Sequence, residues 1–123
     1  MAVLEDLVVW KLAVAFSDAV MELDRINGRR LPRKLRDQLV DAAASVPSNV
    51  AEGYYRNRPR QFVQFIDYAR ASLGEAEARL RIGVVRRAFT QKDIDPILQL
   101  AKRFSVASWR LRAHLERQST GKQ

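Results

Sequence analysis

The sequence predicts an all-α protein, folded as a single antiparallel up-down-up-down four-helix bundle. Apolar residues recur three and four positions apart through four long segments, and no segment alternates polar and apolar residues as a strand does. The 123 residues include only 5 glycines and 4 prolines, and 47% of them are hydrophobic, which is enough to form a core. We therefore expect the bundle to occupy residues 1–118 and residues 119–123 to form a flexible polar tail.

The first helix is expected from about residue 7 to residue 26, with Asp6 as its N-cap. Its main apolar stripe, from Val9 to Leu23, would face the core. A second apolar line lies on nearly the opposite side of the helix, and its members are Leu7, Trp10, Val14 and Met21. Scattered surface hydrophobics are common, but four on one line indicate burial on both sides, either within the bundle or against another subunit.

The second helix, expected over residues 32–53, contains an irregular stretch from Ser45 to Gly53. Pro47 lacks a backbone N–H and should kink or end a helix, yet the apolar spacing continues through it. Asn49 is placed where an N-cap could restart the helix after Pro47, and Gly53 is placed where a glycine could end it. The stretch is either a kinked packing element or a functional one, and we predict continuous packing with interrupted hydrogen bonding.

The polar groups of this stretch are expected to make contacts across the bundle. Ser48, Asn49 and Glu52 are available for them. Arg70, in the next helical segment, flanks the core stripe, and a half-buried arginine needs a carboxylate partner. Glu52, Glu75 and Glu77 are the nearest candidates, and of these we predict Glu52; a binding role for Arg70 is the alternative.

The third and fourth helices are expected over residues 59–89 and 91–117. Asn57 is the expected cap of the third helix, and Thr90, followed by Asp93 in the first turn, is the expected cap of the fourth. The third segment also exceeds the needs of one core face, because the back of its second half is apolar or small. The interface candidates on this back are Ile82, Val85 and Phe89.

The net charge of +8 is spread unevenly along the chain. Residues 1–31 carry four basic and five acidic side chains, whereas residues 91–123 carry seven basic and three acidic ones. A basic balance attracts nucleic acid, although it also serves solubility alone. The candidates for phosphate contacts are Arg58, Arg60, Arg79, Arg81, Arg86, Arg87, Lys92, Lys102, Arg103, Arg110, Arg112 and Arg117.

Motifs for catalysis, cofactors and metals are absent from the sequence. There is no cysteine, and His114 is the single histidine, so neither a Glu-x-x-His metal pair nor a thiolate site can form. No glycine-rich phosphate loop occurs. We expect no enzyme activity, no cofactor and no metal. No apolar run is long enough to cross a bilayer, and the acidic start does not match a signal peptide, so we expect a cytoplasmic protein with no membrane partner.

Three motifs carry a resemblance to a known family. The first is the opening Glu5-Asp6-Leu7-x-Val9-Trp10, and the second runs from Gln38 to Gly53 and includes Ser-x-Pro-Ser-Asn-x-Ala-Glu-Gly. The third consists of Phe62, Phe65, Ala69, Arg70, Ser72, Leu73 and Glu75. With these motifs the chain resembles the small four-helix-bundle proteins encoded in intervening sequences of bacterial large-subunit ribosomal RNA genes, from Glu5 to about Ala107.

The resemblance implies a bundle that assembles into a homopentameric ring, and it implies no established activity. The family is also similar to the basic pentameric accessory protein of diversity-generating retroelements, which works with a reverse transcriptase and its RNA; that likeness is one of fold. Three hypotheses follow. The first is a non-enzymatic ring that binds nucleic acid, RNA above all, and the second is a scaffold or accessory subunit for a protein such as a polymerase. The third, an enzyme, serves as the alternative against which the other two are tested.

Overall fold

The structure, a computed structural model, describes residues 3–121, and within this range four long helices occur and no strand. The helices are α1 (Val8–Asn27), α2 (Arg33–Arg56), α3 (Pro59–Val85) and α4 (Gln91–Gly121). Two short 3₁₀ turns, η1 (Leu4–Asp6) and η2 (Gly28–Arg30), precede α1 and α2. The expected all-helical, four-helix composition is thus confirmed.

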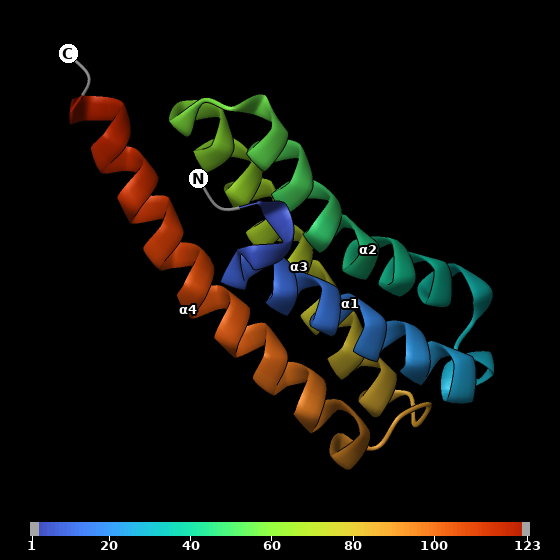
Figure 1. Cartoon of the computed structure of the whole chain (residues 1–123). Coiled ribbons are helices and arrows are strands. Elements are labelled where there is room, and N and C mark those ends of the chain that lie inside the picture. The colour runs from blue at the N-terminus through green and yellow to red at the C-terminus, as the bar shows by residue number, and fades with distance from the viewer. Residues whose placement is uncertain (1–2, 122–123) are drawn as a thin grey trace.

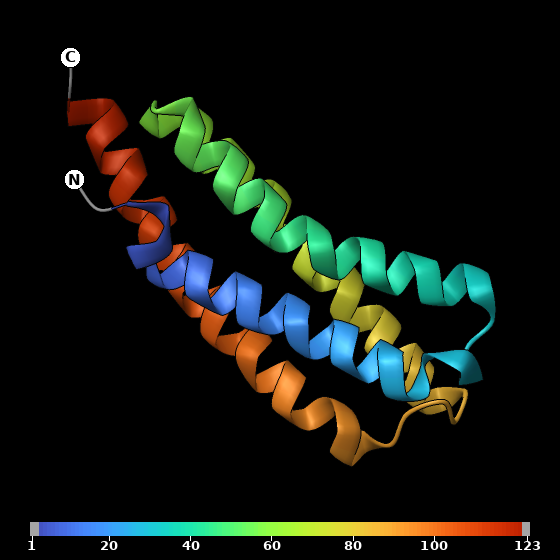
Figure 2. The ribbon, with the colours of Figure 1, turned by 45° about the vertical axis from the view of Figure 1, so that its right-hand side comes forward.

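The four helices lie alongside one another around one core (Figures 1 and 2). Contacts join α1 with α2, α2 with α3, α3 with α4, and α1 with α4. The stripes predicted from the periodicity supply the core, whose largest fully buried side chains come from all four helices. They include Phe16, Leu39, Ile66, Leu80 and Phe104. Full burial of such a side chain contributes about 1.5–3 kcal/mol.

Pro47 lies inside α2, which continues through it, as predicted. The polar neighbours of Pro47 bond to their own helix: the Ser48 hydroxyl donates to the Ala44 carbonyl at 3.0 Å, and the Asn49 amide donates to the Ser45 carbonyl at 2.8 Å. Such bonds to the carbonyl four residues back compete with the helical ladder, which Pro47 has already interrupted. The predicted contacts of these groups across the bundle are therefore wrong.

Gly53 is a close-packing residue and does not end the helix. A Cβ atom at this position would lie 2.7 Å from Cδ1 of Phe62 and 2.8 Å from Cβ of Phe65, so the missing side chain lets α2 and α3 approach. α2 runs on to Arg56 and ends at Asn57, whose left-handed φ of 57° terminates it. Asn57 is therefore the C-cap of α2 and not, as predicted, the cap of α3.

The other helix ends differ from expectation in part. Asp6 does not cap α1, because Leu7 occupies the N-cap position and makes no side-chain capping bond. Thr90 does cap α4: its hydroxyl accepts from the Asp93 N–H at 3.1 Å, and the Asp93 carboxylate accepts from the Thr90 N–H at 2.9 Å. α4 extends to Gly121, so most of the predicted tail is helical, and residues 122–123 lie outside the described residues.

α3 ends four residues earlier than predicted. Arg87 adopts a left-handed φ of 64°, and the N–H groups of Ala88 and Phe89 both donate to the Gly83 carbonyl. This turn folds the Phe89 ring back onto Gly83, where a Cβ atom would clash with the ring. Phe89 is consequently 3% exposed and belongs to the core, which corrects its prediction as an interface residue.

Candidate nucleic-acid interface

Three arginines on α4 form a line on the side of the helix away from its buried stripe. Arg103, Arg110 and Arg117 are seven residues apart, which places each about 10.5 Å from the next along nearly one line. All three side chains are exposed, and no acid forms an ion pair with them within residues 3–121. We call these three residues the α4 arginine stripe.

Other predicted cations flank this stripe or lie at the two ends of the bundle. Lys102 is exposed beside Arg103. The remaining exposed cations lie at the α2–α3 connection (Arg58 and Arg60) and around the α3–α4 connection (Arg81, Arg86, Arg87 and Lys92). In the described part of the chain none of these side chains has an ion-pair partner, so all keep their charge available to solvent.

Two predicted cations are engaged in the fold. Arg112 binds Asp67 of α3 with two bonds, at 2.7 and 3.1 Å, and Glu116 at 2.6 Å. These bonds raise the pKa of Arg112 above its ordinary value, the hydrogen bond to Asp67 having the largest effect. Arg79 is partly buried and donates to the Glu75 carbonyl at 3.2 Å. Neither side chain points freely to solvent, so both are poor candidates for phosphate contacts.

Arg70 ties α3 to α4, and its predicted partner is wrong. Its Nη1 donates to the Ser105 carbonyl and to the Ser108 hydroxyl, both at 2.7 Å, and its guanidinium lies 5.3 Å from the centre of the Trp109 ring. Glu52 instead pairs with Arg56 on its own helix at 3.3 Å. Sequence reasoning sought a carboxylate, whereas a carbonyl, a hydroxyl and an aromatic face satisfy the guanidinium.

Two other polar residues of the third motif, Ser72 and Glu75, make no contact with Arg70. Ser72 is partly buried on α3, and Glu75 is exposed. Neither side chain reaches Arg70. The motif therefore combines packing residues, such as Phe62 and Phe65 against Gly53 of α2, with one polar contact from Arg70 to α4.

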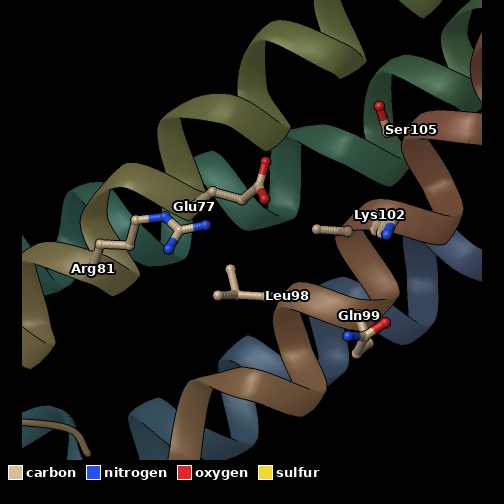
Figure 3. A pocket seen from close by; sticks show the side chains of 7 residues that line it. Glu77, Arg81, Leu98, Gln99, Lys102 and Ser105 are labelled. Carbon is tan, nitrogen blue, oxygen red and sulfur yellow. The ribbon is translucent and has the colours of Figure 1, made fainter. Parts of the chain in front are cut away.

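A groove of about 400 Å³ lies between α3 and α4 (Figure 3). Glu77 and Arg81 border it from α3, and Leu98, Lys102 and Ser105 border it from α4. Partial burial raises the pKa of the Glu77 carboxyl, and the charge of Arg81 opposes that rise. A single carboxylate between two cations does not make a metal site, and the described residues hold no group of three or more potential metal ligands.

A second hollow, of about 670 Å³, opens at the end of the bundle that holds the α2–α3 connection. Its walls come from Leu7 directly before α1, the end of α2, the start of α3 and the last part of α4. The lining residues are Leu7, Tyr54, Tyr55, Asn57, Arg58, Pro59, Phe62, Leu111, His114, Leu115 and Gln118. Sequence reasoning missed this site, which we call the end hollow, although two tyrosines directly before a basic connection were a usable signal.

The predicted oligomer-interface residues divide into buried and exposed groups. Leu7 and Trp10 are partly buried and pack against the core, and Val14 is partly buried as well. Met21, Ile82 and Val85 are exposed, Val85 by 80%. Among the exposed apolar side chains that were not predicted are Val8, Ile26, Val106 and Trp109. On the outer side of α3, exposed small residues accompany Ile82 and Val85 and form one apolar strip: Ala71, Gly74 and Ala78.

Comparison with known proteins identifies a family. The family model described as "23S rRNA-intervening sequence protein" matches residues 5–108 of the chain. No curated protein matches the sequence. Within the described residues, no helix is both long and apolar enough to cross a membrane.

Proposed function

The chain belongs to the 23S rRNA-intervening sequence protein family, and from this premise we propose that it is a non-enzymatic cytoplasmic protein that binds nucleic acid, RNA above all, through phosphate contacts. The observation that carries this proposal is the α4 arginine stripe. Its three guanidinium groups are exposed and unpaired within the described residues, and the stripe spans about 21 Å. Cations in such a row neutralise successive phosphates without reading bases.

The charge of the whole chain supports the same proposal. The chain carries +8. Within the described residues, the ion pairs occupy Arg25, Arg33, Arg36, Arg56 and Arg112 and leave the stripe and both connection clusters unpaired. Free cations concentrated on α4 and its neighbouring connections create a positive field that accelerates the encounter with a polyanion. The binding that results is independent of sequence.

A salt titration tests the proposal. Fluorescence anisotropy of a labelled 20-nucleotide RNA should show binding at 50 mM salt. If only the three stripe arginines neutralise phosphates, raising the salt to 200 mM lowers the affinity by about 20- to 40-fold, and further contacts increase this loss. A chain that binds neither RNA nor DNA at 50 mM salt is not a nucleic-acid-binding protein.

For the architecture we propose the antiparallel up-down-up-down order and assembly into a homopentameric ring. The order is supported by contacts between consecutive helices and by ion pairs that join the end of α1 to the start of α2 (Asp24–Arg36) and the first half of α3 to the last part of α4 (Asp67–Arg112). The exposed outer side of α3 supports assembly, because apolar side chains gathered on one exposed face mark interaction sites more often than scattered ones do.

Light scattering tests the assembly. The protein at micromolar concentration should scatter as an oligomer, and Val85→Lys should weaken that oligomer without loss of helical content, because Val85 is 80% exposed in the single chain. A wild-type monomer at this concentration contradicts the ring. Trp10 is the less informative site, since its ring packs against the core.

A second candidate function rests on the same apolar strip. The strip would equally serve a protein-interaction scaffold or an accessory subunit of a nucleic-acid enzyme such as a reverse transcriptase. Capture of a protein partner that survives nuclease treatment and high salt would favour this function. Loss of the captured partner after nuclease treatment would favour direct binding of nucleic acid.

A further inference from the structure

The end hollow combines aromatic rings with one arginine unpaired within the described residues, Arg58, near the last residues of the α4 arginine stripe. Figures 1 and 2 show the last turns of α4 apart from the α2–α3 connection. The residues that line the hollow come from both of these segments. We propose that the end hollow is a binding site for the unstacked base of a single-stranded nucleic acid whose backbone follows the stripe. This inference rests on the proposed nucleic-acid binding and adds the form of the ligand.

The aromatic rings that line the hollow offer a flat surface on which a planar ligand can stack. Tyr55 and Phe62 line it from α2 and α3, and Tyr55 is 70% exposed, so its ring is accessible from solvent. Tyr54 braces Tyr55 with an edge-to-face contact at a ring-centre distance of 5.1 Å. A ring that is both exposed and held by a neighbour offers a stacking surface at low entropic cost. Bases of any sequence stack on such rings in proteins that bind single strands.

The size of the hollow suits a base and excludes a double helix. Its volume of about 670 Å³ lies within the range of small-molecule sites, whose ligands are commonly of nucleotide size. A paired base inside a duplex cannot reach the rings, because its faces are covered by its stacked neighbours. The hollow therefore selects single strands, loops and ends.

The charge around the hollow is suited to a phosphate chain. Arg58 lines it directly, and Arg110 lies one turn before His114 on α4, while Arg117 precedes Gln118. Two acids near these walls in sequence, Glu52 and Glu116, are already paired with Arg56 and Arg112.

Acidic side chains do not reverse this balance. Glu5 and Asp6, in the turn before Leu7, are exposed at the same end of the bundle. These two negative charges are outnumbered by the three positive charges of Arg58, Arg110 and Arg117, none of which forms an ion pair within the described residues. Arg110 and Arg117 lie on the same turns of α4 as the residues that line the hollow, so a strand bound along the stripe can deliver a base to it.

Matched substitutions at exposed tyrosines test the inference. The probes are a labelled 15-nucleotide mixed-sequence RNA and the same strand annealed to its complement, both measured by anisotropy with the full chain at 50 mM salt. Tyr55→Ala should weaken single-strand binding by about tenfold and leave duplex binding within twofold, whereas Tyr55→Phe should keep the affinity, because the ring alone stacks. Tyr68→Ala removes an exposed tyrosine of α3 outside the hollow and should change neither affinity.

The possible outcomes separate the two proposals. If Tyr55→Ala leaves single-strand binding unchanged, or weakens both probes equally, the end hollow is not a base site, while the phosphate-binding proposal stands. If the wild-type chain binds neither probe, the proposed function itself fails. Photocrosslinking of a 5-iodouridine-substituted RNA gives an independent readout: crosslinks should map to the peptides that contain Tyr55 or Phe62, and crosslinks confined to other peptides overturn the inference.

Discussion

Neutralising the α4 arginine stripe is the most direct perturbation of the proposed surface. The triple variant Arg103→Gln, Arg110→Gln, Arg117→Gln removes three charges from exposed side chains that hold no ion pair in the described structure. Each charge that neutralises a phosphate contributes about 0.9 to the slope of log K against log salt for a duplex and about 0.7 for a single strand. The variant should therefore flatten the slope by about 2–3, and helical content should be unchanged.

The matched control removes the same charge elsewhere. The control is the triple variant Arg25→Gln, Arg29→Gln, Arg33→Gln. These arginines lie around the α1–α2 connection, and Arg25 and Arg33 already pair with Glu22 and Asp37. If the stripe makes the contacts, anisotropy titrations from 50 to 200 mM salt show a nearly wild-type slope for the control and a flattened slope for the stripe variant. Equal slopes for the two variants would show that net charge, and not the α4 surface, governs binding.

Three further predictions concern the fold. Gly53→Ala should lower the free energy of unfolding by about 1–3 kcal/mol despite the better helix propensity of alanine, because its Cβ would clash with Phe62; urea unfolding measures this, and a stabilised variant contradicts the close approach. Thr90→Ala should cost about 1 kcal/mol in the same assay, since the cap of α4 is lost, whereas Thr90→Ser should cost less. Burial raises the pKa of Glu77, so the charged carboxylate destabilises the fold above that pKa. This penalty disappears below the pKa that Glu77 has in the unfolded chain. Glu77→Gln should therefore raise the melting temperature at pH 7, and the gain should vanish near pH 4.

The helical stripes of this chain could be predicted because each helix buries one continuous face. The periodicity placed Phe16, Ile66 and Phe104 in the core, and all three are fully buried. Local signals also identified the cap at Thr90, whose hydrogen bonds span only three residues. Propensity and spacing act over a few residues, so features of this range are readable without the tertiary structure.

The errors came from features that depend on a neighbouring helix. Glycine ends helices often, but Gly53 is explained by Phe62 and Phe65 on α3, which no local pattern shows. Phe89 continues the apolar spacing of α3, yet the left-handed Arg87 redirects the chain and returns its ring to the core. Periodicity assumes that the helix continues, so it assigned Phe89 to the outside.

The candidate site shows the same division. Composition identified the cations of α4 but not which of them are free. Arg110 and Arg112 are two residues apart and therefore point in different directions: Arg112 meets Asp67 on α3, and Arg110 faces solvent. Only the packing of α3 against α4 separates a structural arginine from an available one, and the end hollow requires four helix ends at once.

The structural arginines give the available ones their geometry. Arg70 fixes α4 through the Ser105 carbonyl and the Ser108 hydroxyl, and Arg112 fixes it one turn further on through Asp67. Each contact is polar and directional, so together they set both the register and the rotation of α4 against α3, which apolar packing alone specifies less sharply. Because the stripe lies on the same turns of this helix, its cations are held on a rigid surface at a spacing that the helix determines. Weakening these contacts should thus disturb binding even though neither arginine meets a phosphate.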